Sequence, residues 1–156
     1  MASFLSACQV LLPLAYLLVA FDYGALFFTG KSLRPGSAPL ALWLTVALHG
    51  AYLLSLTITW KQLPAATVAQ ALSFVAFSIV IVYAIVERQA GETSTGFWLV
   101  LPAFGFSLMS SLMAGPEPLE RVLFSKPLFA THVSLALLGY AAFAVSASYG
   151  FLYLRL

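Results

Sequence analysis

The stretch PLALWLTVALHGAYLLSLTITW, residues 39–60, carries no Asp, Glu, Lys or Arg over a length that can cross a membrane. At 1.5 Å per residue it forms a helix of about 33 Å, and the hydrocarbon core of a bilayer is about 30 Å thick. Backbone N–H and C=O groups in lipid must be satisfied within the segment, and the run is too long for a barrel strand. The stretch therefore predicts a transmembrane α-helix.

The rest of the chain has the same apolar character. Of its 156 residues, 62% are hydrophobic and 8% are charged, whereas a soluble protein carries about 25% charged residues. A mean hydropathy of +1.00 excludes an ordinary soluble domain. The net charge of +2 gives no basic face for a nucleic acid. Cys8 is the only cysteine, which excludes an internal disulfide and a thiolate metal cluster.

Four further apolar runs are long enough to span a bilayer, and short polar breaks separate them. We therefore predict an all-α integral membrane protein with five transmembrane helices. Residues 1–156 are expected to form a single transmembrane helical domain without an internal repeat. The predicted helices cover roughly residues 4–28, 39–60, 67–86, 97–113 and 128–154.

The orientation follows from the basic residues that flank the predicted helices. Lys and Arg are enriched on the cytoplasmic side of membrane proteins, and one side of this chain holds four of them against three on the other. The larger group is Lys31, Arg34, Arg88 and Arg155, and the smaller is Lys61, Arg121 and Lys126. We predict an N-out/C-in topology, in a bacterial inner membrane or an equivalent organellar membrane.

Two histidines, His49 and His132, lie within these apolar runs. A titratable ring in hydrocarbon is costly and usually has a partner or a function. Imidazole is a common metal ligand, heme iron included, so both are candidate cofactor-binding and metal-ligating residues. A structural hydrogen bond to a neighbouring helix is the alternative for each. His49 needs an internal partner, and Tyr52 lies on its face of the helix.

The depths of the two histidines argue for separate sites. His49 lies about 16 Å below the outer end of its helix and His132 about 6 Å below the same surface. Axial ligands of one iron would lie about 4 Å apart, given bonds of about 2 Å. We therefore expect two heme-iron sites rather than one, if iron is bound.

One face of the fifth predicted helix is made mostly of small residues. At 100° per residue, this face contains His132, Ala136, Gly139, Phe143, Ser146 and Gly150. Small side chains allow another backbone or a flat ligand to approach closely. The face predicts a helix-packing seam with other membrane subunits, with or without a ligand at its outer end.

Asp22 is the only carboxylate inside a predicted span. We expect it to pair with Lys31 or Arg34, because a proton relay would need more buried acids. The sequence has no hydrolase triad, no phosphate-binding loop and no paired broken helices of a transporter. No catalytic residue is therefore assigned, and the chain is not expected to be an enzyme.

Residues 131–143, Thr-His-Val-Ser-Leu-Ala-Leu-Leu-Gly-Tyr-Ala-Ala-Phe, resemble the His-Val-Ser…Tyr-Ala segment of the cytochrome c assembly protein family. These are the CcsA/HemX-type heme-handling membrane proteins. The second helix with its central His49, the segment from Ser73 to Arg88, and Leu101-Pro102 resemble the family's second, third and fourth helices more loosely. The resemblance concerns only the family's N-terminal five-helix portion.

The resemblance implies heme binding and presentation at the outer face of the membrane for cytochrome c biogenesis. His132 matches the family's outer histidine and His49 its intramembrane histidine. Family members usually have further helices, a tryptophan-rich outer loop and a second outer histidine, which this sequence lacks. A partner chain then supplies the missing half, the sequence is a piece of a longer protein, or the chemistry has been lost.

A second hypothesis requires no heme. The chain is then a non-catalytic accessory subunit of a larger respiratory or photosynthetic membrane complex. Its helices would brace neighbouring subunits and bind lipid or pigment. The high apolar content and the short loops are typical of such subunits.

Overall fold

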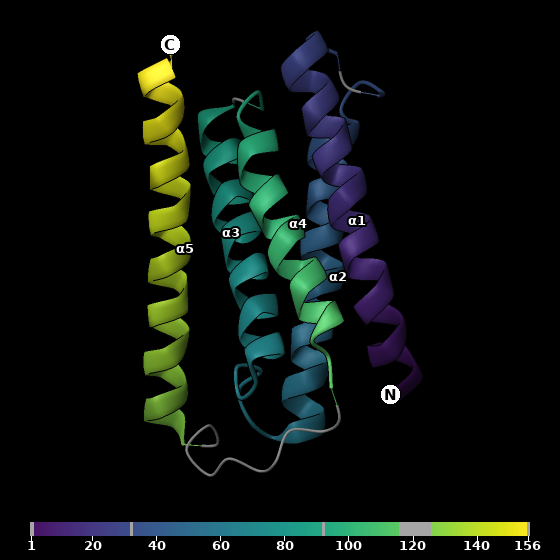
Figure 1. Cartoon of the computed structure of the whole chain (residues 1–156), viewed down its shortest axis with the longest axis vertical. Coiled ribbons are helices and arrows are strands. Elements are labelled where there is room, and N and C mark those ends of the chain that lie inside the picture. The colour runs from purple at the N-terminus through teal and green to yellow at the C-terminus, as the bar shows by residue number, and fades with distance from the viewer. Residues whose placement is uncertain (1, 32, 92, 116–125, 156) are drawn as a thin grey trace.

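The structure, a computed structural model, describes residues 2–31, 33–91, 93–115 and 126–155. The described residues form an all-helical chain, and the five helices expected from the sequence are present in the expected order (Figure 1). The helices are α1 (Ala2–Thr29), α2 (Ser37–Trp60), α3 (Val68–Ala90), α4 (Gly96–Leu112) and α5 (Pro127–Arg155).

Helices α1 to α4 form a bundle in which α1 packs against α2 and α4, and α3 packs against α2 and α4. Helix α5 packs along α3, touches α4, and makes no contact with α1 or α2 within the described residues. The N-terminus and the start of α5 lie at the lower end in Figure 1. The α1–α2 and α3–α4 turns and the C-terminus lie at the upper end (Figure 1).

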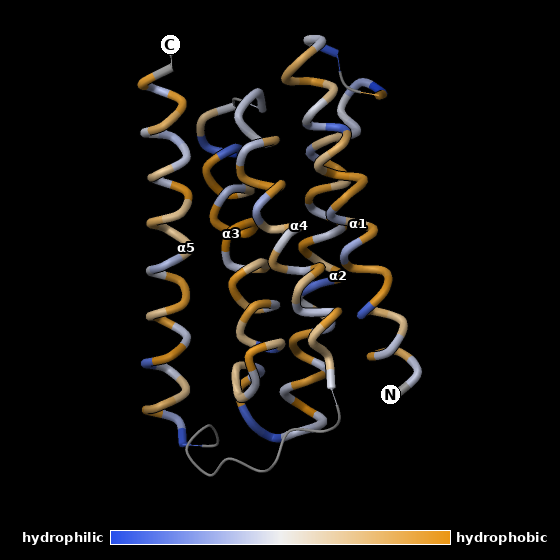
Figure 2. The backbone as a smooth tube through the Cα atoms, in the orientation of Figure 1, coloured by the Kyte–Doolittle hydropathy of each residue, from blue (hydrophilic) through white to orange (hydrophobic). Residues whose placement is uncertain are grey.

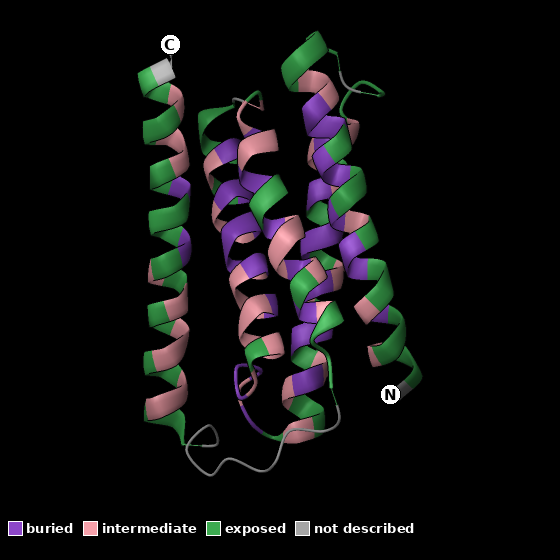
Figure 3. Ribbon diagram, viewed as in Figure 1, coloured by how far each residue is buried: buried purple, intermediate pink, exposed green. Residues whose placement is uncertain are grey.

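The bundle is apolar on its outside as well as in its core. Hydrophobic positions recur along every helix in Figure 2, and exposed positions occur on all five helices in Figure 3. Leu18, Phe21 and Leu44 are each more than 60% exposed. A helix that is hydrophobic all round suits a lipid environment, because lipid tails solvate its outer face. The arrangement is that of a helical membrane protein.

Four of the helices are long and apolar enough to cross a membrane. These are α1, α2, α3 and α5, over Ser3–Thr29, Ser37–Trp60, Val68–Ala90 and Pro127–Leu154. Helix α4 is apolar but has 17 residues, which cover about 25 Å. It begins at Gly96, after the α3–α4 turn, and ends at Leu112, which makes it the shortest of the five helices.

Helix α3 extends four residues beyond its predicted end at residue 86 and continues to Ala90. Gly91 ends it with a left-handed φ of 68°, and its N–H donates to the carbonyl oxygen of Glu87 at 2.8 Å. Glycine adopts this conformation without a steric cost. The expectation that Asp22 is the only carboxylate within a helical span was wrong, because Glu87 lies inside α3 and is 5% exposed.

Helix α5 is the least covered of the four long helices. Only 11% of the residues in its apolar stretch are buried, against 33% to 44% in the other three. It contacts the bundle through Ala141 and Val145, which are buried, and Tyr149, whose hydroxyl lies 3.1 Å from Oγ1 of Thr95.

The small face predicted on α5 points away from the other helices of this chain. His132 and Phe143 are exposed, and a Cβ added at Gly139 or Gly150 would meet no atom within 4 Å. The seam is therefore not used within the described chain, since α5 packs through its opposite side. Its contact with other subunits stays a prediction.

Candidate functional site

Three helices meet at His49, whose two ring nitrogens are both hydrogen-bonded. Nδ1 lies 2.8 Å from the hydroxyl of Tyr16 on α1, and Nε2 lies 2.8 Å from the hydroxyl of Ser73 on α3. A neutral imidazole has one donor and one acceptor nitrogen, so one hydroxyl donates to the ring and the other accepts from it. We call Tyr16, His49 and Ser73 the histidine cluster.

Aromatic side chains enclose the imidazole. The ring of His49 is fully buried and packs edge-on against Tyr16 and Phe77, with centroid distances of 5.6 and 5.4 Å. The expectation of an internal partner for His49 is confirmed. The suggested partner Tyr52 bonds to neither ring nitrogen; its ring lies 6.1 Å away. Sequence alone did not reveal Tyr16 or Ser73, since they are 33 and 24 residues distant.

In the observed side-chain arrangement, the surroundings of His49 do not fit heme iron. Iron ligation needs a free ring nitrogen, and both nitrogens already have hydroxyl partners. Iron at this position would have to displace Tyr16 or Ser73. No group of three His, Cys, Asp or Glu side chains able to hold a metal ion occurs among the described residues.

His132 lies in a different environment. It is exposed near the lower end of α5. Helix α5 packs along α3 but makes no contact, within the described residues, with α2, which carries the buried His49. The structure thus places the two histidines in separate parts of the chain. Iron ligation by His132 stays a prediction.

A second buried cluster lies nearer the upper end, around Glu87. The hydroxyls of Tyr23 on α1 and Tyr83 on α3 both donate to Oε2 of Glu87, at 2.5 and 2.6 Å. The two phenol rings contact each other edge to face at 5.8 Å, and both are fully buried. A buried carboxyl group is tolerated when hydrogen bonds replace its lost hydration. We call these three residues the glutamate cluster.

Gly96, the first residue of α4, leaves the space that the glutamate cluster needs. A Cβ added at this position would collide with the ring of Tyr23 and lie 2.6 Å from the hydroxyl of Tyr83. The backbone of α4 therefore packs directly against the two phenols. The sequence did not predict this cluster, because Glu87 follows the apolar run directly and is assigned to the polar segment that ends the third helix.

Asp22 shapes the turn between α1 and α2. Its Oδ1 accepts from the backbone N–H of Leu33 at 2.8 Å, and its Oδ2 accepts from the hydroxyl of Ser37, the first residue of α2. A carboxylate at a helix N-terminus also interacts favourably with the helix dipole. Asp22, which we expected to pair with Lys31 or Arg34, thus has partners in the turn and at the start of α2.

An apolar layer separates the two buried clusters. Tyr16 and Tyr23 are seven residues apart, about 10.5 Å along α1. The buried residues between the clusters include the apolar Val19, Ala76 and Val80. Ser78, which is also buried there, donates to the carbonyl oxygen of Phe74 on its own helix. The described side chains therefore form no continuous hydrogen-bonded path between the clusters, although a second buried acid is present.

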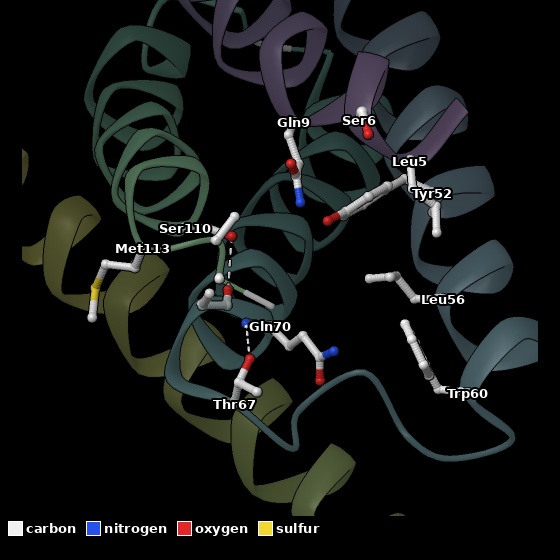
Figure 4. Close-up of a pocket in the computed structure, with 13 residues that line it drawn as sticks. Leu5, Ser6, Gln9, Tyr52, Leu56, Trp60, Thr67, Gln70, Ser110 and Met113 are labelled. Atoms are coloured by element: carbon white, nitrogen blue, oxygen red, sulfur yellow. Dashed lines mark hydrogen bonds between the residues drawn. The ribbon is translucent and has the colours of Figure 1, made fainter. Parts of the chain in front are cut away.

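A pocket of about 420 Å³ opens at the lower end of the bundle, between α1, α2, α3 and α4 (Figure 4). The described residues that line it include no Asp, Glu, Lys, Arg or His. Its polar side chains come from all four helices and from the turn before α3. They are Ser6, Gln9, Tyr52, Thr67, Gln70 and Ser110.

Comparison of the chain with known protein families, with curated proteins and with solved structures finds no match in any of the three. The resemblance of residues 131–143 to the cytochrome c assembly family therefore rests on those residues themselves.

Proposed function

We propose that this chain is the membrane-embedded helical part of a heme-handling assembly of the cytochrome c assembly type. In this proposal His132 binds heme iron at the outer end of α5, and further membrane helices cover α5. The observation that carries the proposal is the exposed position of His132 on the least covered long helix. An imidazole facing only lipid is costly, so a ligand or a partner is expected on this face.

The small face of α5 supports the same proposal. Gly139 and Gly150 have open space where a side chain would be, and Ser146 between them is exposed. A flat porphyrin edge or the backbone of another helix can approach such a surface closely. When bound, heme would supply the iron porphyrin that the assembly presents. This chain would contribute the His132 imidazole and the small residues within about two helical turns of it, Ala136 and Gly139.

His49 has a structural role in this proposal. Its bonds to Tyr16 and Ser73 link α1, α2 and α3 in the interior of the bundle. The resemblance implies a second, deeper heme at this residue. That heme would require a rearrangement of the histidine cluster, so we assign heme binding to His132 alone.

The proposed topology has five membrane-crossing helices, with the N-terminus outside and the C-terminus in the cytoplasm. The upper end, with Lys31, Arg34 and Arg88, is then cytoplasmic, and the lower end, with Lys61 and Lys126, faces outward. The slight excess of basic residues at the upper end supports this orientation. The membrane is a bacterial inner membrane or an equivalent organellar membrane, and His132 is on its outer side.

A second candidate function is that of a non-catalytic accessory subunit in a respiratory or photosynthetic complex. The observation that favours it is the satisfied interior, since the histidine and glutamate clusters bond within themselves. In that case the exposed side of α5 binds a neighbouring subunit, lipid or pigment. Neither candidate function makes the chain an enzyme.

An absorption spectrum of the native complex separates the two functions. The heme proposal expects a Soret band that His132→Ala weakens or shifts, because alanine cannot replace an imidazole ligand. His49→Gln is the matched control and should leave the band in place. A native complex without heme would contradict the heme proposal and favour the accessory function. An unchanged heme content in the His132→Ala protein would remove the ligand assignment alone.

A further inference from the structure

The pocket at the lower end of the bundle differs from the two buried clusters because its polar groups border an open space. Its volume of about 420 Å³ lies in the range of small-molecule sites, roughly 300–1,000 Å³. Figure 4 shows the amide of Gln9 and the hydroxyl of Tyr52 directed toward each other and into this space. Neither residue belongs to the histidine cluster or to the glutamate cluster.

Hydrogen bonds within the walls hold the pocket in shape. The hydroxyl of Ser110 donates to the carbonyl oxygen of Ala69 at 2.7 Å, which ties α4 to α3. The backbone N–H of Gln70 donates to Oγ1 of Thr67 at 3.2 Å. The amide oxygen of Gln70 accepts from the N–H of Ala66 at 3.1 Å. These bonds leave the amide nitrogen of Gln70 as a donor for a ligand.

One wall of the pocket is largely hydrophobic. Tyr52, Leu56 and Trp60 line it from α2, and their four-residue spacing places them on one face of that helix. The side chain of Gln70 extends from α3 toward this wall (Figure 4). Aromatic side chains favour stacked or edge-on contacts with a planar ring. A ring bound here would meet the wall on one side and amide groups at its edges.

The charge of the lining selects the ligand class. Because the described lining residues are all uncharged, a phosphate or carboxylate group would lose hydration without gaining a counter-charge. Heme, with its two propionates, is disfavoured on the same ground. The surrounding helices are apolar on the outside, which favours a membrane-soluble ligand.

We propose that this pocket binds the head group of an uncharged, ring-bearing membrane amphiphile, with the chemistry of a quinone or quinol. Its oxygens would bond to the side chains of Gln9, Tyr52 and Gln70, and its ring would lie against the α2 wall. This binding site is independent of the heme proposal, because it uses neither His132 nor the small face of α5.

The fluorescence of Trp60 provides the test, because Trp60 lines the pocket and the chain has only three tryptophans. With Trp43 and Trp98 replaced by Phe, the whole chain in phosphatidylcholine nanodiscs is titrated with a benzoquinone that carries a decyl tail. We expect saturable quenching of Trp60. Gln9→Leu and Tyr52→Phe should each raise the half-saturating concentration about two- to ten-fold, as expected for one neutral hydrogen bond.

Gln89→Leu and Tyr153→Phe make the same chemical changes at exposed positions elsewhere and should leave the half-saturating concentration unchanged. Ala69→Phe, which places a ring in the pocket, should abolish saturation, and circular dichroism verifies that each variant is folded. Linear quenching that is equal in all variants would show simple partition into lipid and overturn the proposal. Displacement of the quinone by an equal concentration of a monoacylglycerol would overturn the ring-bearing class.

Discussion

Tyr23 and Glu87, 64 residues apart in the sequence, are joined by a 2.5 Å hydrogen bond in the interior of the bundle. The bond links α1 to α3, and Tyr83 donates to the same carboxyl oxygen. The buried carboxyl group of Glu87 thus links α1 to α3 next to the start of α4.

Glu87→Ala should destabilise the folded chain strongly. The substitution leaves two buried phenol hydroxyls without an acceptor, and each such loss costs about 1–3 kcal/mol. Glu87→Gln keeps one acceptor oxygen and should cost less. Thermal unfolding in detergent measures both, and the exposed neighbour Arg88 provides the control Arg88→Ala. Equal melting temperatures for Glu87→Ala and Arg88→Ala would show that the cluster contributes no stability.

Gly96→Ala should also be destabilising, although alanine is the better helix former. Its Cβ would overlap the ring of Tyr23, and overpacking of this kind costs about 1–3 kcal/mol. Gly139→Ala is the matched control, since a Cβ there meets no atom within 4 Å. Its expected effect on the melting temperature is neutral or slightly stabilising. The reverse order of the two variants would contradict the packing around Tyr23.

A double-mutant cycle on Tyr16 and His49 measures the histidine cluster. His49→Phe leaves the hydroxyls of Tyr16 and Ser73 without their ring partner, and we expect a loss of about 1–3 kcal/mol. Adding Tyr16→Phe removes one orphaned hydroxyl and should recover about 0.6 kcal/mol, the average coupling of membrane hydrogen bonds, and at most about 1.7 kcal/mol. Strictly additive losses in the chemical unfolding of the four proteins would mean that the two side chains are not coupled.

Gly139→Leu should separate packing within the chain from packing with a partner. The isolated chain is expected to keep its melting temperature, because α5 faces open space at this residue. The native complex, in contrast, should dissociate in mild detergent, where a bulky side chain blocks close approach. Ala144→Leu, at an exposed position on a different side of α5, is the control. A complex of unchanged size would mean that lipid, not protein, covers the small face.

The proposed orientation predicts the location of the C-terminus. A reporter that is active only in the cytoplasm, fused after residue 156, should be active, and one active only in the periplasm should be silent. Replacing Lys31 and Arg34 with neutral residues removes part of the charge bias and should lower the cytoplasmic signal. A periplasmic signal from the unaltered fusion would reverse the topology and place His132 on the inner side.

The sequence by itself determined that this is a helical membrane-type chain and where most helices lie. Apolar runs such as residues 39–60 are long, and a backbone in lipid has few ways to satisfy its hydrogen bonds. The end of α3 was predicted four residues too early, because the sequence pattern makes Glu87 the first residue of a polar loop. Its burial depends on Tyr23, which lies on another helix.

Only the tertiary structure decided which side chains meet. In a soluble helix the apolar stripe indicates the inner face, but lipid-exposed helices are apolar all round, so periodicity did not show which face of α5 packs inward. The partners of His49 on α1 and α3 likewise depend on the relative rotation and depth of three helices. Those are set by contacts between helices, such as Gly96 against Tyr23, and no local sequence pattern encodes them.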